Sequence, residues 1–156
     1  MPRAATAAIA LGSNLDSQWG DRVQNLREAI RRLESLGHIR AVSAFYDTAP
    51  VGYTDQPRFL NAALLLETGM KPLDLMRGML SIERAMGRER TVPKGPRVID
   101  LDLLLYDDLV MNTDELMLPH PAIAERRFVL EPLAEIAPQM KHPASGLTVS
   151  EMLARA

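Results

Sequence analysis

Two aspartates, Asp100 and Asp102, lie in an otherwise aliphatic stretch, GPRVIDLDLLLY at residues 95–106. In a β-strand, residues two apart point to the same face, so both carboxylates lie on one face and the aliphatic residues that alternate with them lie on the other. Neighbouring carboxylates repel each other, and a bound divalent cation relieves that repulsion. Protein carboxylates and substrate phosphates together commonly hold Mg²⁺. The pattern indicates a Mg²⁺ site, although a half-exposed strand whose polar face meets water or arginines has the same spacing.

A basic loop precedes these acids. Its four cations lie within ten residues of one another and are Arg88, Arg90, Lys94 and Arg97. A polyphosphate that bridges a metal ion to guanidinium groups would satisfy both sets of charges. Glycines at both ends of the loop would let it move. The alternative is a solvated surface loop, because arginine and lysine are usually exposed.

A histidine and an arginine after the strand are further candidates for phosphate contacts. His120 lies between two prolines, which hold its backbone extended and fix the direction of the imidazole. Arg126 follows on a predicted helical turn and presents a guanidinium that can reach an anion. A lone histidine is also often structural, so both interpretations stay open.

Two aromatic residues and an amide suit a flat ring. Phe59 and Asn61 are two residues apart in a predicted strand and therefore share a face. An amide can donate to and accept from a heterocycle, and flat rings stack on aromatic side chains such as Phe59 and Phe128. Core packing is the alternative for both phenylalanines, because this residue type is often buried.

Hydrophobic periodicity and turn residues define the elements that must position these groups. The expected order is a strand at 6–11, a helix at 18–36, a strand at 39–47, a loop at 48–58, a strand from 59, a helix from 72 to 87 and the strand 95–106. The order βαββαβ predicts an α+β fold of the ferredoxin-like type, an antiparallel sheet with both helices on one face. Short helical pieces are expected in the C-terminal tail, around 128–138 and 147–156.

Length and composition limit the classes of function. The 156 residues suit one domain spanning 1–156, and the net charge of −2 gives no overall attraction to nucleic acid or to an anionic membrane. The chain has no cysteine, which excludes disulfides and fits a reducing compartment. The apolar N-terminal run is too short for a membrane span and is more typical of a strand than of a signal peptide. We therefore expect a cytoplasmic protein that binds small molecules.

Five stretches in order along the chain resemble the 6-hydroxymethyl-7,8-dihydropterin pyrophosphokinase family of folate biosynthesis. They are ALGSNL at 10–15, QPRFLNAA at 56–63, IERAMGRER at 82–90, GPRVIDLDLLLY at 95–106 and LPHPAIAERRFVLEPLAEIAP at 118–138. The resemblance implies transfer of the β,γ-diphosphate of ATP to the hydroxymethyl group of the pterin, with release of AMP. It also implies a monomer that uses Mg²⁺ and takes ATP as co-substrate.

The resemblance further implies a role for each candidate residue. Asp100 and Asp102 would hold two Mg²⁺ ions, and Arg88, Arg90 and Arg97 would come from a loop that closes over the reactants. His120 and Arg126 would contact ATP. The pterin would lie between Phe59 and Phe128, with its hydrogen-bonding edge read by Asn61 and by the backbone at Thr48, Pro50 and Val51. Glu83 matches a family position near the site.

Two other functions use the same residues. A two-metal phosphodiesterase or nucleotidyltransferase would use the same acids and would turn over without a pterin. An RNA-binding platform on a ferredoxin-like sheet would place aromatic and basic residues on the sheet face. The paired acids on the last strand disfavour that platform, because they repel phosphates unless a metal ion lies between.

Overall fold

The central sheet has the predicted ferredoxin-like topology. The computed structural model describes residues 4–51, 54–88 and 96–156. Strand β1 (Ala5–Ser13) lies in the middle and pairs antiparallel with β4 (Phe59–Thr68) on one side and β5 (Asp100–Tyr106) on the other. Strand β2 (His38–Val42) pairs with the far edge of β4, which gives the order β2-β4-β1-β5. The short strand β3 (Tyr46–Thr48) also pairs with β4.

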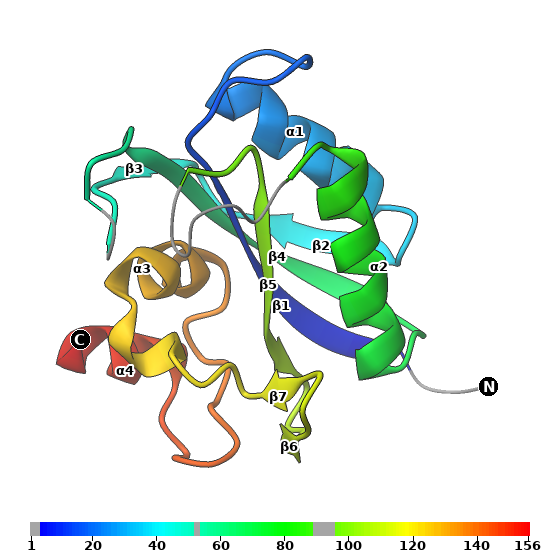
Figure 1. The fold of residues 1–156 in the computed structure, drawn as a ribbon. Helices are drawn as coiled ribbons and strands as arrows, with labels where there is room; N and C mark the ends of the chain where they lie inside the picture. The colour runs from blue at the N-terminus through cyan, green and yellow to red at the C-terminus, as the bar shows by residue number, and fades with distance from the viewer. Residues whose placement is uncertain (1–3, 52–53, 89–95) are drawn as a thin grey trace.

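Two helices cover one face of this sheet, as predicted. Helix α1 (Arg22–Leu33) begins where the side chain of Asp21 accepts a hydrogen bond from the Gln24 amide, and α2 (Pro72–Ala85) begins with a proline, a residue that suits the first helical turn. Figure 1 shows α1 and α2 side by side on the same side of the sheet. Their buried side chains form one core with the sheet residues that face them, including Ile9, Leu64 and Leu101.

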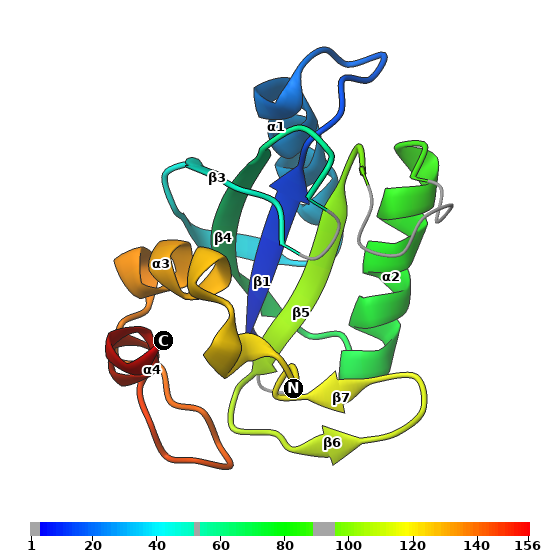
Figure 2. The same cartoon turned by 60° about the vertical axis from the view of Figure 1, so that its left-hand side comes forward.

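The C-terminal segment covers part of the opposite face. A 3₁₀ turn (Ile123–Glu125) leads into α3 (Arg127–Ile136), and α4 (Val149–Arg155) packs against α3. Figure 2 shows both helices on the side of the sheet away from α1 and α2. A second core between α3, α4 and the sheet uses small residues of β1, Ala8 and Ala10. Within the described ranges, none of the helices combines the length and apolar character needed to span a bilayer.

The structure corrects the bounds of several elements. The single strand predicted at 39–47 is wrong: it is two strands, because the Ser43 hydroxyl accepts the hydrogen bond from the Ala63 amide, and regular pairing resumes only at Tyr46. The predicted helix at 18–36 is shorter at both ends. The last strand begins at Asp100, because the backbone of Arg97 bonds to Asn14 instead of joining the sheet ladder.

A small hairpin after β5 was not predicted. Its strands are β6 (Met111–Asn112) and β7 (Met117–Leu118), and they form a separate two-stranded sheet. Each strand has only two residues, which is too short for an alternating hydrophobic pattern to be visible in the sequence. The hairpin brings the chain to His120, whose amide donates to the carbonyl of Leu104 at 2.9 Å.

Candidate active site

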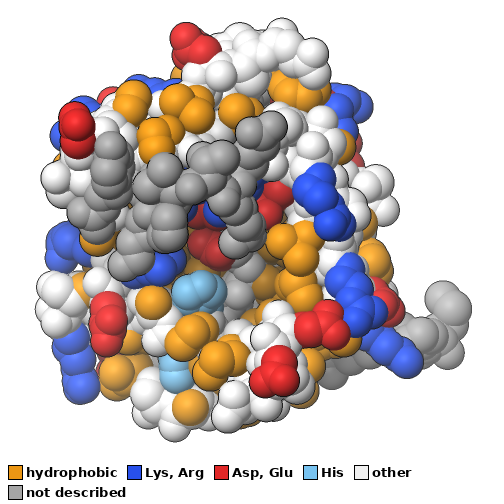
Figure 3. Space-filling view, viewed as in Figure 1, with side chains coloured by type: hydrophobic (Ala, Val, Ile, Leu, Met, Phe, Trp, Pro, Cys, Tyr) orange, Lys and Arg blue, Asp and Glu red, His pale blue; other side chains and the backbone are white. Residues whose placement is uncertain are grey.

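A cavity of about 100 Å³ opens on the sheet face that α3 covers only in part. Figure 3 shows acidic side chains in a hollow near the centre of this view, with basic side chains and a histidine near them. Most of the residues predicted to bind the pterin or the phosphates line it. The lining residues from the predicted set are Thr48, Val51, Phe59, Asn61, Arg97, Asp100, Asp102, Arg126 and Phe128.

Both aspartates project from β5 into this cavity. Their neighbours Ile99, Leu101 and Leu103 point to the opposite face and join the core beneath α1 and α2. The alternation therefore follows the two-residue period of a strand. On the adjacent strand β1, Asp100 lies opposite Gly12 and Asp102 lies opposite Ala10, so small residues flank both carboxylates.

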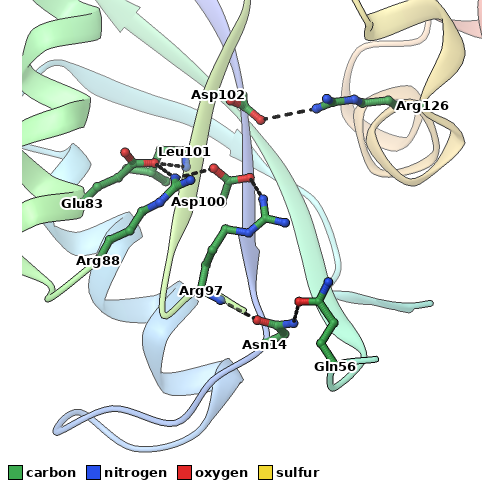
Figure 4. Close-up of polar contacts among 9 residues, drawn as sticks. All are labelled: Asn14, Gln56, Glu83, Arg88, Arg97, Asp100, Leu101, Asp102 and Arg126. Atoms are coloured by element: carbon green, nitrogen blue, oxygen red, sulfur yellow. Dashed lines mark hydrogen bonds and ion pairs between the residues drawn. The ribbon is translucent and has the colours of Figure 1, made fainter. Parts of the chain in front are cut away.

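Asp100 is paired with two arginines (Figure 4). It accepts hydrogen bonds from Nη1 of Arg88 at 2.6 Å and from Nη1 of Arg97 at 3.1 Å. Arg88 also donates to the buried carboxylate of Glu83 at 2.6 Å. Burial opposes the charge of Arg88, but Asp100 and Glu83 together hold its pKa above the ordinary value. The first carboxylate of the pair is thus compensated by protein cations.

Asp102 has a different electrostatic environment. It forms an ion pair with Arg126, whose Nη1 lies 3.9 Å from Oδ2. Burial and the neighbouring charge of Asp100 raise the pKa of Asp102 to about 7, and Arg126 offsets only part of this. A carboxylate whose ionised form is disfavoured in this way gains from an added cation.

Glu83 connects α2 to the strand that carries the acids. Its Oε2 accepts the amide hydrogen of Leu101, the residue between the two aspartates, at 2.7 Å. The side chain is buried, and the same oxygen accepts from Arg88. Glu83 therefore fixes both β5 and Arg88 relative to α2. From the sequence, this residue only matched a family position near the site, and these contacts give it a structural role.

The aromatic rings lie on two different elements across the cavity. Phe59 begins β4 and Phe128 lies in the first turn of α3. A guanidinium lies near each ring: the Cζ atom of Arg97 is 4.8 Å from the centre of Phe59, and that of Arg126 is 5.9 Å from the centre of Phe128. The rings and the cations therefore share the same space, and a planar ligand that stacks on a ring would compete with an arginine for it.

The amide of Asn61 faces the same cavity. Asn61 is buried in β4, and its Nδ2 donates to the hydroxyl of Thr48 on β3. Thr48 and Val51 line the cavity together with Ala49. Pro50 lies between lining residues but is not itself one of them. Arg90 was also predicted at the site, and together with Lys94 it lies outside the described residues.

A second cavity, of about 290 Å³, adjoins the first. It is lined by His120, by apolar side chains such as Met76 and Leu103, and by Asp102, which therefore lines both cavities. Nδ1 of His120 accepts a hydrogen bond from the Ala122 amide, and burial together with Arg126 lowers the pKa of the imidazole. A neutral, oriented imidazole thus borders this second space.

Sequence reasoning missed two residues that shape the site, Gly12 and Asn14. Gly12 lines the first cavity, and a Cβ atom placed there would lie 3.0 Å from Oδ1 of Asn61. Asn14 is 2% exposed and bonds to the segments that lead to Arg97 and Phe59. Both belong to the ALGSNL stretch that carried the family resemblance, but neither is a residue type whose chemistry stands out without its contacts.

Paired carboxylates, arginines and aromatic rings around one cavity are typical of an enzyme that transfers phosphate groups to a flat substrate. Residues 8–138 match the family model described as 7,8-dihydro-6-hydroxymethylpterin-pyrophosphokinase (HPPK). The chain belongs to this family, which confirms the resemblance drawn from the sequence.

Bacterial relatives of similar length carry the enzyme's name. The chain is 46% identical over 151 residues to the 2-amino-4-hydroxy-6-hydroxymethyldihydropteridine pyrophosphokinase of Methylorubrum extorquens, covering 96% of this chain and 92% of the relative. It is 44% identical over 141 residues to the protein of the same name from Bacillus subtilis, covering 89% and 82%.

Eukaryotic relatives are much longer. The folic acid synthesis protein FOL1 of Dictyostelium discoideum is 42% identical over 92% of this chain, and the chain spans only 21% of its length. A solved Plasmodium falciparum HPPK-DHPS covers 98% of this chain and 45% of its own with a TM-score of 0.78 at 16% identity, a likeness that concerns the fold.

Proposed function

We propose that the chain transfers the β,γ-diphosphate of ATP to the hydroxymethyl group of 6-hydroxymethyl-7,8-dihydropterin, with release of AMP, in folate biosynthesis. The observation that carries this proposal is the position of Asp102, which lines both cavities. The first cavity offers rings and an amide to a pterin, and the second offers His120 and apolar side chains to a nucleotide. The reacting groups of the two substrates would meet at the acids.

Asp100 and Asp102 would hold Mg²⁺, and we propose two ions. The donor set fits, because both ligands are carboxylate oxygens and the raised pKa of Asp102 reflects a charge that burial and Asp100 disfavour. Among the described residues no group of three or more histidines, cysteines or acids is placed to hold a metal ion, so phosphate oxygens and water would complete the coordination. Bound Mg²⁺ would neutralise phosphate charge and lower the pKa of the pterin hydroxyl.

The protein's own cations would bind and orient the triphosphate. Arg88 and Arg97 donate to Asp100, and with Mg²⁺ held by that carboxylate both guanidinium groups would be available to phosphate oxygens. A pterin that stacks on Phe59 would also replace Arg97 at the ring, which turns the same guanidinium toward the phosphates. Arg90, from the basic loop, is proposed to join them. His120 and Arg126 would contact ATP from the side of α3.

The pterin would be selected by shape and by its polar edge. Phe59 and Phe128 would hold its two faces. The Asn61 amide and the backbone at Thr48, Pro50 and Val51 would pair with the donors and acceptors of the ring. A ligand of this kind uses the narrow space that the small residues of β1 leave open.

Product identity tests the proposal directly. Incubation of the protein with ATP, Mg²⁺ and hydroxymethyl-dihydropterin should give AMP and the pterin diphosphate, with turnover that requires the pterin. Formation of ADP, or turnover without a pterin as a phosphodiesterase would show, contradicts it. The Asp102→Asn variant is the matched control for contaminating activity. We also propose a cytoplasmic monomer, which cell fractionation and light scattering test.

A further inference from the structure

A single buried side chain, Asn14, connects three segments around the site. Its backbone amide donates to the carbonyl of Arg97 at 3.0 Å, and its Oδ1 accepts the Arg97 amide hydrogen at 2.8 Å. Its Nδ2 donates to Oε1 of Gln56 at 2.9 Å and to the carbonyl of Pro57 at 3.0 Å. The side chain thus uses its acceptor on one segment and both of its donor hydrogens on another. Figure 4 shows the bonds to Arg97 and Gln56.

The two tethered segments carry groups that must lie at a set distance from each other. Arg97 places its guanidinium 3.1 Å from Asp100 and over the ring of Phe59. Gln56 and Pro57 precede Phe59, the first residue of β4, by three and two residues. Neither segment is a strand at the point where Asn14 binds it, so sheet pairing does not fix their separation.

We propose that Asn14 is a positioning residue that fixes the Arg97 backbone relative to the start of β4, and thereby sets both phosphate orientation and pterin binding. The inference rests on the proposed function. Only a primary amide serves here: aspartate has no donor when ionised, and serine has neither the reach nor two donor hydrogens. Misplacement of an orienting group by about 1 Å costs up to about 10²-fold in rate.

A second buried asparagine provides a matched control. Asn25 in α1 is 0% exposed and bonds to Ser13, Ser17 and the carbonyl of Leu15. It holds the same loop after β1 but does not line the cavity, and its side-chain hydrogen bonds within the described part of the chain go to residues 13–17 and not to the segments that carry Arg97 and Phe59. The variants Asn14→Ala and Asn25→Ala each leave buried polar groups without a partner, so both should lower Tm, by roughly 5 °C.

Steady-state kinetics with ATP, Mg²⁺ and the pterin separates positioning from folding. Asn14→Ala should lower kcat/KM for the pterin about 30-fold or more, with kcat and KM both affected, while Asn25→Ala stays within about threefold of wild type. The Asn14→Ala/Arg97→Ala double variant should have nearly the kcat of Arg97→Ala alone, because the effect on kcat acts through Arg97.

A conservative variant keeps the test decisive if Asn14→Ala does not fold. Asn14→Asp retains the acceptor for the Arg97 amide and loses both donors to the 56–57 segment, so it should raise the pterin KM more than it lowers kcat. The inference is overturned if Asn14 and Asn25 variants lose activity equally, or if Asn14→Asp leaves the pterin KM unchanged. If wild type does not turn over with the pterin, the proposed function fails and the inference fails with it. If the wild type turns over with the pterin but the Asn14 and Asn25 variants lose activity equally, only the inference about Asn14 is overturned.

Discussion

The two faces of the sheet differ in the size of the side chains that β1 presents to them. Toward α1 and α2 it presents Ile9 and Leu11, which are buried in the larger core. Toward α3 it presents Ala8, Ala10 and Gly12, none of which has a side chain larger than a methyl group. Around β1, the first face is packed with large side chains and the second has room for a ligand in the first cavity, while the second cavity lies beside the edge strand β5, between α2 and residues 114–121.

The acids lie beside the small residues of β1. Asp100 is opposite Gly12 and Asp102 is opposite Ala10, while Leu101 on the same strand packs into the filled face. Helices α3 and α4 cover the other end of the open face. One alternating strand therefore serves stability on one face and binding on the other, and variants on the two faces should fail in different ways.

Removal of an acid on the open face should have the largest effect. We expect Asp102→Ala to lower kcat/KM by about 10³-fold or more, because charge stabilisation at a metal-carboxylate site contributes several kcal/mol to the transition state. The Tm should stay unchanged or rise, since burial and Asp100 disfavour the charge that is removed. Steady-state assays and thermal unfolding measure the two effects. A large fall in Tm would show instead that Asp102 is mainly structural.

A large-to-small change on the filled face should show the reverse pattern. Leu64 of β4 is fully buried in the core beneath α1 and α2. Leu64→Ala should lower the free energy of unfolding by about 2–5 kcal/mol. Urea denaturation measures this loss, and kcat per folded molecule should stay within about threefold of wild type. A fall in kcat as large as that of Asp102→Ala would mean that the two faces are not separable.

Much of the difference between the two faces of the sheet could be predicted from the sequence. The βαββαβ order, the two helices on one face and the shared direction of Asp100 and Asp102 all follow from hydrophobic periods of 3.6 and 2 residues, and the structure has them. Periodicity works for these elements because each is long and has one buried face. The family assignment, which the comparisons confirm, depended on five ordered stretches and not on periodicity.

The remaining features depend on contacts between distant residues. The break at Ser43 arises from a hydroxyl that bonds to the backbone 20 residues away, and the role inferred for Asn14 arises from bonds to residues 42, 43 and 83 positions away. The strand start was misplaced because Arg97 bonds to Asn14 instead of a neighbouring strand. Such contacts leave no local pattern, so only the assembled structure reveals them.

The pKa of Asp102 gives the open face a characteristic pH dependence. A carboxyl with a folded-state pKa of about 7, and an unfolded value of about 3.9, binds more protons when folded than when unfolded between those pH values. Its contribution to stability is therefore present at low pH and lost as pH rises toward about 7. Relative to Asp102→Asn, the wild type should lose at most about 1.4 kcal/mol per pH unit across this range. Urea denaturation of both proteins without Mg²⁺ measures the difference, and parallel pH profiles would contradict it.

The smallest change we consider adds one methyl group to the open face. In Gly12→Ala the new Cβ would lie 3.0 Å from Oδ1 of Asn61, so this amide, which we propose binds the pterin, must shift by a few tenths of an ångström. The nearest ring carbon of Phe59 would be at 3.8 Å, an ordinary van der Waals contact. We expect the pterin KM to rise about tenfold with little change in the KM for ATP, since a shift of this size in a close-packed site affects only the ligand that touches it. Gly69→Ala is the matched control, because a Cβ there has no atom within 4 Å. Calorimetry of pterin binding gives the same comparison without turnover. If Gly12→Ala and Gly69→Ala bind pterin equally well, the small residues of β1 do not define the pterin site, and the difference between the two faces is one of packing alone.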